Sequence, residues 1–303
     1  MRVAVTGSSG LIGKALVELL NGSGHEVVRI VRDQQARDEN TRYWNPATGD
    51  IDDDALNNID GVIHLAGANI GNRRWSQNRK RELRQSRVAA TELLVEAMNA
   101  AINPPTVLVA GSGIGFYGDR DDEELNESTG AGNGFLANLT VDWETAANKA
   151  QDAGTRVALA RTGLVVAANA PFLTKMLMPF KLGLGGTLGN GQQWWSWIDL
   201  DDEVRALVFL LTSELSGPVN LCSPNPITNR GFTRTLGTVL KRPTFLSIPR
   251  FGPRLLLGAE LADELLFSST RAIPEALNNA GFEFHHDDLQ TTLQQAIAKN
   301  PKD

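Results

Sequence analysis

The chain has 303 residues, of which 42% are hydrophobic and 21% charged, and its net charge at pH 7 is −6. This composition excludes general disorder, and the length suits one large α/β domain with a smaller partner. The acidic balance disfavours nucleic acid, and the single Cys222 excludes a multi-cysteine zinc site. No apolar run reaches the about 18 residues of a membrane helix, so we expect a cytoplasmic protein without metal, nucleic-acid or membrane partners.

Strands alternate with helices through the first 168 residues. Short apolar runs bounded by turns predict strands, and apolar residues spaced three and four apart predict helices. In chain order the expected elements are strand 2–6, helix 11–20, strand 26–31, strand 61–66, helix 77–101, strand 106–110, helix 140–153 and strand 156–160. Such alternation implies parallel strands joined by right-handed crossovers, and therefore a doubly wound parallel α/β sheet.

The pattern changes after residue 168, where a Met-, Phe- and Leu-rich segment at 171–182 precedes a glycine loop at 183–191. The further expected elements are helix 201–211, strand 218–221 and helices 232–240, 255–267 and 289–298. We expect a large domain over 1–168, to which the chain returns near 197–220. A smaller α/β C-terminal portion, 169–303, would cover the carboxyl edge of the sheet on the substrate side.

A glycine turn joins the first strand to the first helix. Gly7 permits the tight turn, Gly10 removes a side chain where a pyrophosphate approaches backbone N–H groups, and Gly13 lets helix and strand pack closely. The phosphates would then lie at the positive end of the helix dipole. The turn therefore predicts a dinucleotide site, to which Ser9, Leu11 and Ile12 also belong. The alternative is a turn that is merely tight.

The end of the second strand indicates which dinucleotide binds. An acidic residue there holds the ribose hydroxyls of NAD, whereas a cation holds the 2′-phosphate of NADP. Here Arg32 comes first and can grip a phosphate with two hydrogen bonds, and Asp33 follows. We therefore predict NADP(H) in preference to NAD(H); the alternative is that Arg32 is solvated and Asp33 takes the ribose.

Related motifs follow several of the predicted strands: Gly7-x-x-Gly10-x-x-Gly13, His64-Leu-Ala-Gly67, Gly111-Ser-Gly-Ile-Gly-Phe-Tyr-Gly118 and Arg161-Thr-Gly163. Together they resemble the extended and atypical short-chain dehydrogenase/reductase superfamily, in its epimerase/dehydratase branch. A narrower set spans nearly the whole chain, at 43–46, 65–70, 74–75, 86–87, 142–144, 179–186, 196–198, 242–243, 269–274 and 281–284. It resembles the nucleoside-diphosphate-sugar epimerase-like proteins, whose C-terminal domain of unknown role would include the family-specific segment 240–290. The resemblance implies a Rossmann-type NAD(P)-binding domain over 1–168.

The resemblance also implies further cofactor residues. Leu65, Ala66, Gly67 and Val165 would lie at the nicotinamide half, and Glu82 and Arg87, on the long helix, would lie near the cofactor. For Glu82 and Arg87 the alternative is an exposed helix face. The basic run from 73 to 87 is interrupted by Glu82 and has little aromatic interleaving, so it does not predict a nucleic-acid surface.

The superfamily's catalytic residues are not at their expected places. Extended members use a Ser, and a Tyr and Lys four residues apart, to exchange a proton while the cofactor exchanges hydride. No Tyr-x-x-x-Lys occurs in this chain; by alignment to Glu144 and Tyr117, the Tyr, Lys and Ser positions hold Leu136, Thr140 and Gly113. Ser112, Tyr117 and Asp142 are the nearby candidates for acid/base work. Packing and turn roles are the alternatives for Tyr117 and Ser112.

Three of the six tryptophans lie at 194, 195 and 197. They could form an aromatic wall against a small molecule or a nucleotide base, with Trp195 and Trp197 on one face of a strand. Core packing is the alternative for at least one of them.

Two functions remain open. One is an NADP-dependent, epimerase-like oxidoreductase acting on a small-molecule or nucleotide-sugar substrate without the usual Tyr and Lys. The other is a catalytically inactive NADPH-binding protein with a regulatory or partner-binding role.

Overall fold

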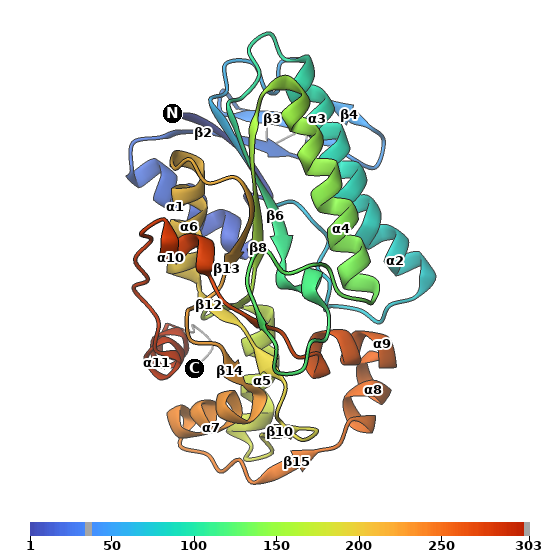
Figure 1. Ribbon diagram of the computed structural model, residues 1–303, viewed down its shortest axis with the longest axis vertical. Coiled ribbons are helices and arrows are strands. Elements are labelled where there is room, and N and C mark those ends of the chain that lie inside the picture. The colour runs from blue at the N-terminus through green and yellow to red at the C-terminus, as the bar shows by residue number, and fades with distance from the viewer. Residues whose placement is uncertain (34–37, 300–303) are drawn as a thin grey trace.

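The computed structural model describes residues 1–33 and 38–299, so the last four residues of the expected C-terminal portion, 300–303, lie outside the described residues. Its centre is an eight-stranded sheet in the order β13-β8-β6-β5-β1-β2-β3-β4 (Figure 1). Every neighbouring pair is parallel except β3 and β4. The strands are β1 (Arg2–Thr6), β2 (Glu26–Val31), β3 (Thr41–Asn45), β4 (Asp50–Ile51), β5 (Gly61–His64), β6 (Val107–Gly113), β8 (Arg156–Thr162) and β13 (Gly217–Leu221). The prediction of a doubly wound parallel α/β sheet is confirmed.

Helices cover both faces of this sheet because its central strands are apolar on both sides. On one face α1 (Leu11–Gly22) and α6 (Leu200–Thr212) pack through a cluster that includes Leu16, Leu20 and Leu207. On the other face α3 (Ala90–Ala100) and α4 (Phe135–Asn148) pack through Leu94, Met98 and their neighbours. The carboxyl ends of the strands therefore meet at one edge, where α/β sheets bind their ligands.

Several elements differ from the sequence-based expectation, among them α4, which runs over Phe135–Asn148 where a helix was expected at 140–153. The strand β3 was not predicted, because its polar and aromatic residues form no apolar run. The long helix 77–101 consists of α2 (Gln77–Arg84), a π-helical turn at Gln85–Ala89 and α3. The expected helix 255–267 is interrupted at Gly258, whose φ of 92° favours glycine, and this separates α8 (Phe251–Leu257) from α9 (Ala259–Ala262).

The remaining elements build a second lobe at the lower end of Figure 1. A cluster that includes Leu177, Trp197, Phe232 and Leu293 forms its core. Its elements are α5 (Pro171–Lys181), β10 (Gly186–Leu188), β11 (Trp194–Trp195), β14 (Ile227–Thr228), α7 (Asn229–Leu240), β15 (Leu246–Ile248), α8, α9 and α11 (Leu289–Ala298). Short pairs β9 (Leu164–Val166) with β12 (Trp197–Asp199), and β7 (Glu124–Leu125) with β16 (Arg271–Ala272), link the lobe to the sheet, and α10 (Glu275–Asn279) packs on β13. Within the described residues, no helix is both long and apolar enough to cross a membrane.

Candidate functional site

The glycine turn between β1 and α1 has the geometry of a phosphate cradle. Gly7 has φ of 70°, and a Cβ added there would lie 2.8 Å from the Leu65 carbonyl carbon. A Cβ on Gly13 would lie 2.2 Å from the Gly7 oxygen, so both glycines are required by the fold itself. A Cβ on Gly10 would meet only the Gly7 oxygen, at 3.3 Å, and no side chain caps the first turn of α1. Gly10 therefore leaves the helix N-terminus open to an anion.

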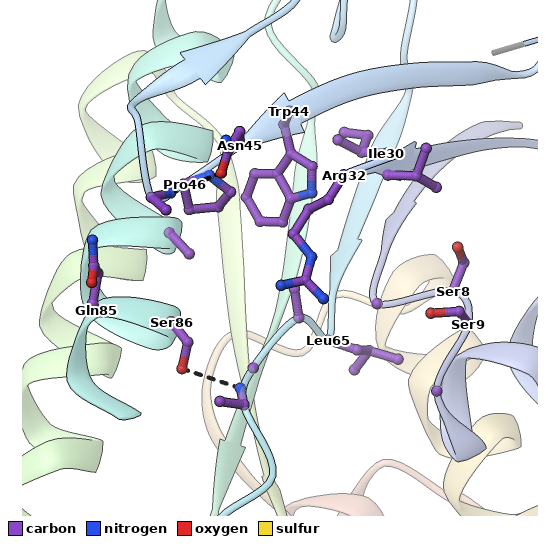
Figure 2. Close-up of a pocket in the computed structure, with 18 of the residues that line it drawn as sticks. Ser8, Ser9, Ile30, Arg32, Trp44, Asn45, Pro46, Leu65, Gln85 and Ser86 are labelled. Carbon is purple, nitrogen blue, oxygen red and sulfur yellow. Dashed lines mark hydrogen bonds between the residues drawn. The ribbon is translucent and has the colours of Figure 1, made fainter. Parts of the chain in front are cut away.

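This cradle opens into a cavity of about 380 Å³ at the carboxyl edge of the sheet (Figure 2). The sequence-predicted residues Gly7, Ser9, Gly10, Arg32, Leu65, Ala66, Gly67 and Glu82 line it. Figure 2 shows the Arg32 side chain extended into the cavity, and no carboxylate among the described residues pairs with it. The cavity thus joins an open helix N-terminus to a guanidinium available for an anion. Trp44 and Pro46, which lie in the family motif at 43–46, also line the cavity. The sequence did not predict this because it did not predict β3.

Leu11, Ile12 and Val165 contribute their side chains elsewhere. Leu11 packs against the core of the second lobe, while Ile12 and Val165 pack against the sheet cluster. Any role of Leu11 and Ile12 toward a phosphate therefore falls to their backbone N–H groups.

The strand end that holds Leu65–Gly67 is fixed by a buried histidine. The Thr91 hydroxyl donates to the Arg87 carbonyl (2.6 Å), so it must accept from His64 Nε2 (3.0 Å). His64 Nδ1 consequently accepts from the Thr6 hydroxyl (2.7 Å), whose oxygen in turn accepts from the backbone N–H groups of Leu65 and Ala66. Burial lowers the pKa of His64 to about 4, which keeps the ring neutral in this role.

Glu82 and Arg87 take different places along α2 and the π-helical turn. Glu82 lines the first cavity and forms an ion pair with Arg79, with 2.5 Å between Glu82 Oε1 and Arg79 Nη1. Arg87 is buried, donates to the Ala68 carbonyl (3.0 Å) and lies 5.2 Å from the Trp143 ring. Burial and the charge of Arg79 lower the pKa of Arg87 to about 10, so it stays cationic at neutral pH. The exposed-face alternative is therefore wrong for Arg87.

A second cavity, of about 360 Å³, adjoins the first. Gly67 lines the first cavity and Arg87 the second, and a Cβ on Gly67 would lie 3.2 Å from Arg87 Cζ, so the two cavities are neighbours on either side of Gly67 and Arg87. The walls are mostly apolar and aromatic, including Leu136, Trp143, Phe172, Trp194 and Trp195. The hydroxyl-bearing residues that line it are Ser112, Thr140, Thr162, Ser196, Ser268 and Thr270.

Ser112 is the predicted acid/base candidate that lies in this cavity. Its hydroxyl donates to Glu144 Oε1 (2.6 Å), and Arg161 holds both oxygens of Glu144 at 2.8 Å. Because the Ser112 proton points at Glu144, the lone pairs of the Ser112 oxygen remain available to a hydroxyl donor. The neighbouring Gly113 also lines the cavity, and an added Cβ there would meet nothing nearer than 3.8 Å, so packing does not require glycine.

The structure places the other two acid/base candidates elsewhere. Tyr117 is fully buried, and its hydroxyl donates to Asn220 Oδ1 (2.8 Å) and accepts from Arg161 (3.1 Å), with burial raising the pKa of the phenol. Asp142 of α4 is partly exposed and pairs with Arg84 of the neighbouring helix α2. Tyr117 therefore has the packing role given as its alternative, and the expectation for Asp142 is corrected because its carboxylate is committed to an exposed ion pair.

The tryptophan expectation also needs correction. Trp197 is 1% exposed, and its indole N–H donates to the Asn225 carbonyl (2.9 Å), so it belongs to the core. Trp195 lines the second cavity and meets Phe172 edge-to-face, with 5.4 Å between ring centroids. Trp194 lines the same cavity. Trp195 and Trp197 were expected on one strand face, but Ser196 separates two short strands, β11 and β12, that pair with different partners.

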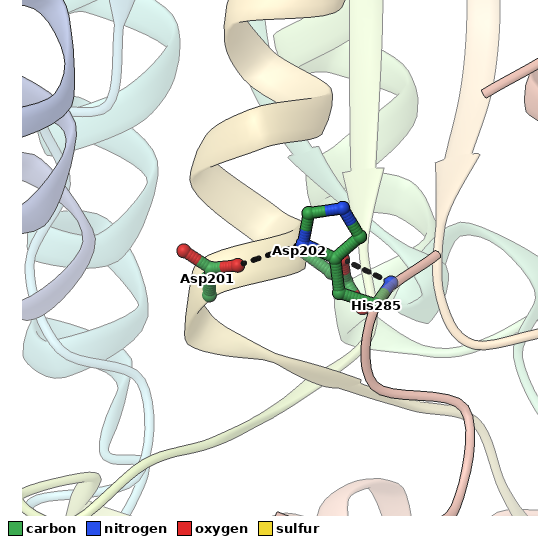
Figure 3. A group of neighbouring side chains, drawn as sticks. All are labelled: Asp201, Asp202 and His285. Carbon is green, nitrogen blue, oxygen red and sulfur yellow. Dashed lines mark hydrogen bonds and ion pairs between the residues drawn. The ribbon is translucent and has the colours of Figure 1, made fainter. Parts of the chain in front are cut away.

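One group of carboxylate and imidazole side chains lies outside both cavities (Figure 3). Asp202 is fully buried and accepts from the backbone N–H groups of His285 (2.9 Å) and His286 (2.8 Å) and from Arg205 (2.6 Å). Asp201 lies 3.6 Å from His285 Nδ1. The Arg205 guanidinium and the two amides satisfy Asp202, so this group is a clamp that ties the chain near residue 285 to α6.

The fold and the cradle define a dinucleotide-binding protein of the Rossmann type. Residues 3–222 match the NAD dependent epimerase/dehydratase family, and residues 248–296 match a domain of unknown function, DUF1731. The chain belongs to this epimerase/dehydratase family and carries that second domain at its C-terminal side. The resemblance inferred from the sequence is confirmed.

Relatives and solved structures match this chain along nearly its whole length. An epimerase family protein of Mycobacterium leprae is 47% identical over 298 residues, covering 98% of this chain and 96% of its own. The crystal structure of human epimerase family protein SDR39U1 with NADPH superposes with a TM-score of 0.89 at 32% identity, covering 99% of this chain and all of that one. A nucleoside-diphosphate sugar epimerase from Corynebacterium glutamicum gives a TM-score of 0.79 at 34% identity, covering 98% of this chain and 58% of the other.

Proposed function

We propose that the protein is an NADPH-dependent oxidoreductase that acts on a small, largely apolar hydroxyl or carbonyl compound in the second cavity. The observation that carries the proposal is that a cavity suited to a dinucleotide and a cavity suited to a substrate lie next to each other, on either side of Gly67 and Arg87. The human relative SDR39U1, whose structure was determined with NADPH, supports this choice of cofactor.

The residues of the first cavity fit a phosphorylated dinucleotide. Gly7 and Gly13 would form the turn, the open N-terminus of α1 at Gly10 would hold the pyrophosphate, and Arg32 would hold the 2′-phosphate. When bound, the cofactor supplies or accepts the hydride.

In the direction of alcohol oxidation, Ser112 would receive the substrate hydroxyl proton and pass its own proton to Glu144. The substrate C–H bond would break as its hydride passes to the oxidised cofactor, and a carbonyl would form. Arg161 keeps Glu144 in place beside Ser112 with two parallel hydrogen bonds. In the reductive direction the same two protons return. This assigns to Ser112 and Glu144 the proton transfer that the missing Tyr and Lys perform elsewhere in the superfamily.

The cofactor assignment predicts a selective effect of Arg32→Ala. Loss of the guanidinium should weaken NADPH binding by tenfold or more, since a charge-assisted bond is worth roughly 1.5–3 kcal/mol. NADH, which has no 2′-phosphate, should lose much less. Fluorescence titration with both cofactors measures this, and equal losses would contradict the assignment.

The catalytic assignment predicts that Ser112→Ala lowers kcat about 100-fold or more while the NADPH dissociation constant stays within about twofold. The measurement is NADPH oxidation at 340 nm, with product mass, in a pooled extract of neutral carbonyl compounds and nucleotide sugars. Ser268→Ala is a matched control on the same cavity wall. Turnover by Ser112→Ala at the wild-type rate would refute the role of Ser112. Absence of turnover by the wild type across the pool, with tight NADPH binding retained, would favour the non-catalytic alternative.

A further inference from the structure

The charges of this chain are divided unevenly between its parts. Residues 170–198 and 223–259, which we call the acid-free lobe, contain eight of the 29 Lys and Arg residues and none of the 35 Asp and Glu residues. The lobe holds α5, β10, β11, α7, β15 and α8, at the lower end of Figure 1. The two stretches therefore carry a charge of +8 in a protein whose net charge is −6.

Exposed apolar side chains gather on the same lobe. Among the described residues, ten large hydrophobic side chains are exposed, and all but Met1 and Ile102 belong to the acid-free lobe. These eight are Met178, Leu182, Leu184, Phe245, Leu246, Phe251, Leu255 and Leu256. Such a concentration is unusual for a surface that meets only water.

The segments that carry these side chains lie close together in space. Strand β10, which follows Leu184, pairs with β15, which begins at Leu246. Lys175 of α5 donates to the Gly71 carbonyl (2.8 Å), and Arg74 donates to the Leu256 carbonyl (3.1 Å) of α8, so α5 and α8 flank the same stretch of chain. Helix α8 has no buried residue. The exposed apolar side chains of α5, β15 and α8 thus lie on neighbouring segments of the acid-free lobe.

Cations border this surface and line a hollow beside it. Arg234, Lys241 and Arg242 line an open hollow at the C-terminal end of α7, directly before Phe245 in the chain. Arg250 and Arg254 are exposed next to Phe251 and Leu255. Arg254 is paired with Asp263, at 2.8 Å, so its charge is partly balanced. Bulky apolar side chains therefore alternate with cations along 241–256.

We propose that the acid-free lobe docks on an anionic lipid surface. Phe245, Phe251 and Leu255 would enter the interfacial layer, and the hollow formed by Arg234, Lys241 and Arg242 would take a lipid phosphate. A second copy of the chain fits this face poorly, because a two-fold interface would set cations against cations with no acidic residue of the lobe to pair them. The expectation of no membrane partner rested on the lack of a spanning segment, which does not bear on docking at the surface.

The test is cosedimentation of the full-length protein with vesicles. One set of vesicles contains phosphatidylcholine alone, and the other contains about 30% phosphatidylglycerol in phosphatidylcholine. Binding to each set is measured at about 0.05 M and about 0.5 M NaCl. We expect binding to the anionic vesicles only, and a loss at high salt. Phe251→Ser with Leu255→Ser should lower the bound fraction at least tenfold, and Arg234→Glu with Lys241→Glu should lower the partition coefficient at least fivefold per substitution.

The control for the apolar substitutions is Ile102→Ser, at an exposed apolar residue outside the lobe. The control for the charge reversals is Lys149→Glu, at an exposed lysine that follows α4. Both should bind vesicles as the wild type does, and all variants should retain NADPH binding as evidence of folding. Failure of the wild type to bind anionic vesicles at low salt would overturn the proposal. So would a dimer in sedimentation equilibrium that the Phe251→Ser, Leu255→Ser variant dissolves, because the face would then be a self-interface.

Discussion

At the residue scale, His64 links the stability of the protein to pH. Its folded pKa of about 4 lies below the ordinary value of 6.5, so between these values the unfolded chain binds the proton more readily than the folded one. The contribution of His64 to the free energy of unfolding is fully present above pH 6.5 and falls by about 3 kcal/mol as the pH drops to 4. Urea titrations from pH 7 to 4 should show a fall that is absent in His64→Gln.

Glu203 is a necessary control for that measurement. It is fully buried, and burial raises its pKa to about 8, so its contribution has the opposite sign and is lost as pH rises from 4.5 to 8. The His64 comparison should therefore be made in a Glu203→Gln background as well. The assignment of a neutral Nε2–H tautomer would be contradicted if His64→Gln left the pH dependence of the unfolding free energy unchanged in both backgrounds. It would also be contradicted if ¹⁵N spectra showed the His64 ring protonated at pH 5.5.

Residues whose place depends on neighbours in the chain could be predicted from the sequence, and residues whose place depends on distant contacts could not. Gly7, Gly10 and Gly13 act within one turn, so their spacing was enough to predict the cradle. The burial of Trp197 and Tyr117 depends on partners distant in the sequence, Asn225 and Asn220, and the sequence carries no local sign of those contacts. The sequence marks Glu144 only as a family position. Its hydrogen bond with Ser112 arises because α4 packs beside the end of β6.

At the element scale, the C-terminal domain caps a helix of the dinucleotide-binding domain. Helix α4 begins after Gly134, which offers no side-chain cap, and Glu264 accepts from the N–H groups of Phe135 and Leu136, each at 2.8 Å. Because this carboxylate lies at the positive end of α4, Glu264→Ala should cost about 1–2 kcal/mol, and Glu264→Gln less. Chemical denaturation measures the difference.

The control for this prediction is Glu260→Ala, one turn earlier. Glu260 is exposed and pairs with Lys80, so its loss should cost less than about 1 kcal/mol. Equal losses at 260 and 264 would show that the cap at Phe135 contributes nothing beyond a surface ion pair. The sequence could not predict this cap, because 128 residues separate Glu264 from Leu136.

At the scale of the whole molecule, the fold class was predictable and the way its two parts join was not. Alternating strand and helix patterns predicted the parallel sheet, whereas the second lobe is built from two- and three-residue strands with no periodicity to detect. The uneven distribution of charge differs from this, because the lack of Asp and Glu in 170–198 and 223–259 can be read from the sequence. Only the fold shows that these two stretches lie together.

The joined parts should unfold as one cooperative unit. The sheet cluster contains Leu277 and Phe282 from the C-terminal side, β13 completes the sheet, and Arg74 and Lys80 bind the segment that carries α8 and α9. Calorimetry should therefore show a single transition, and NADPH at about 100 times its dissociation constant should raise its Tm by roughly 5 °C, since binding to the folded state adds about 2.7 kcal/mol. Two transitions, with NADPH shifting only one, would mean that the acid-free lobe unfolds independently of the sheet.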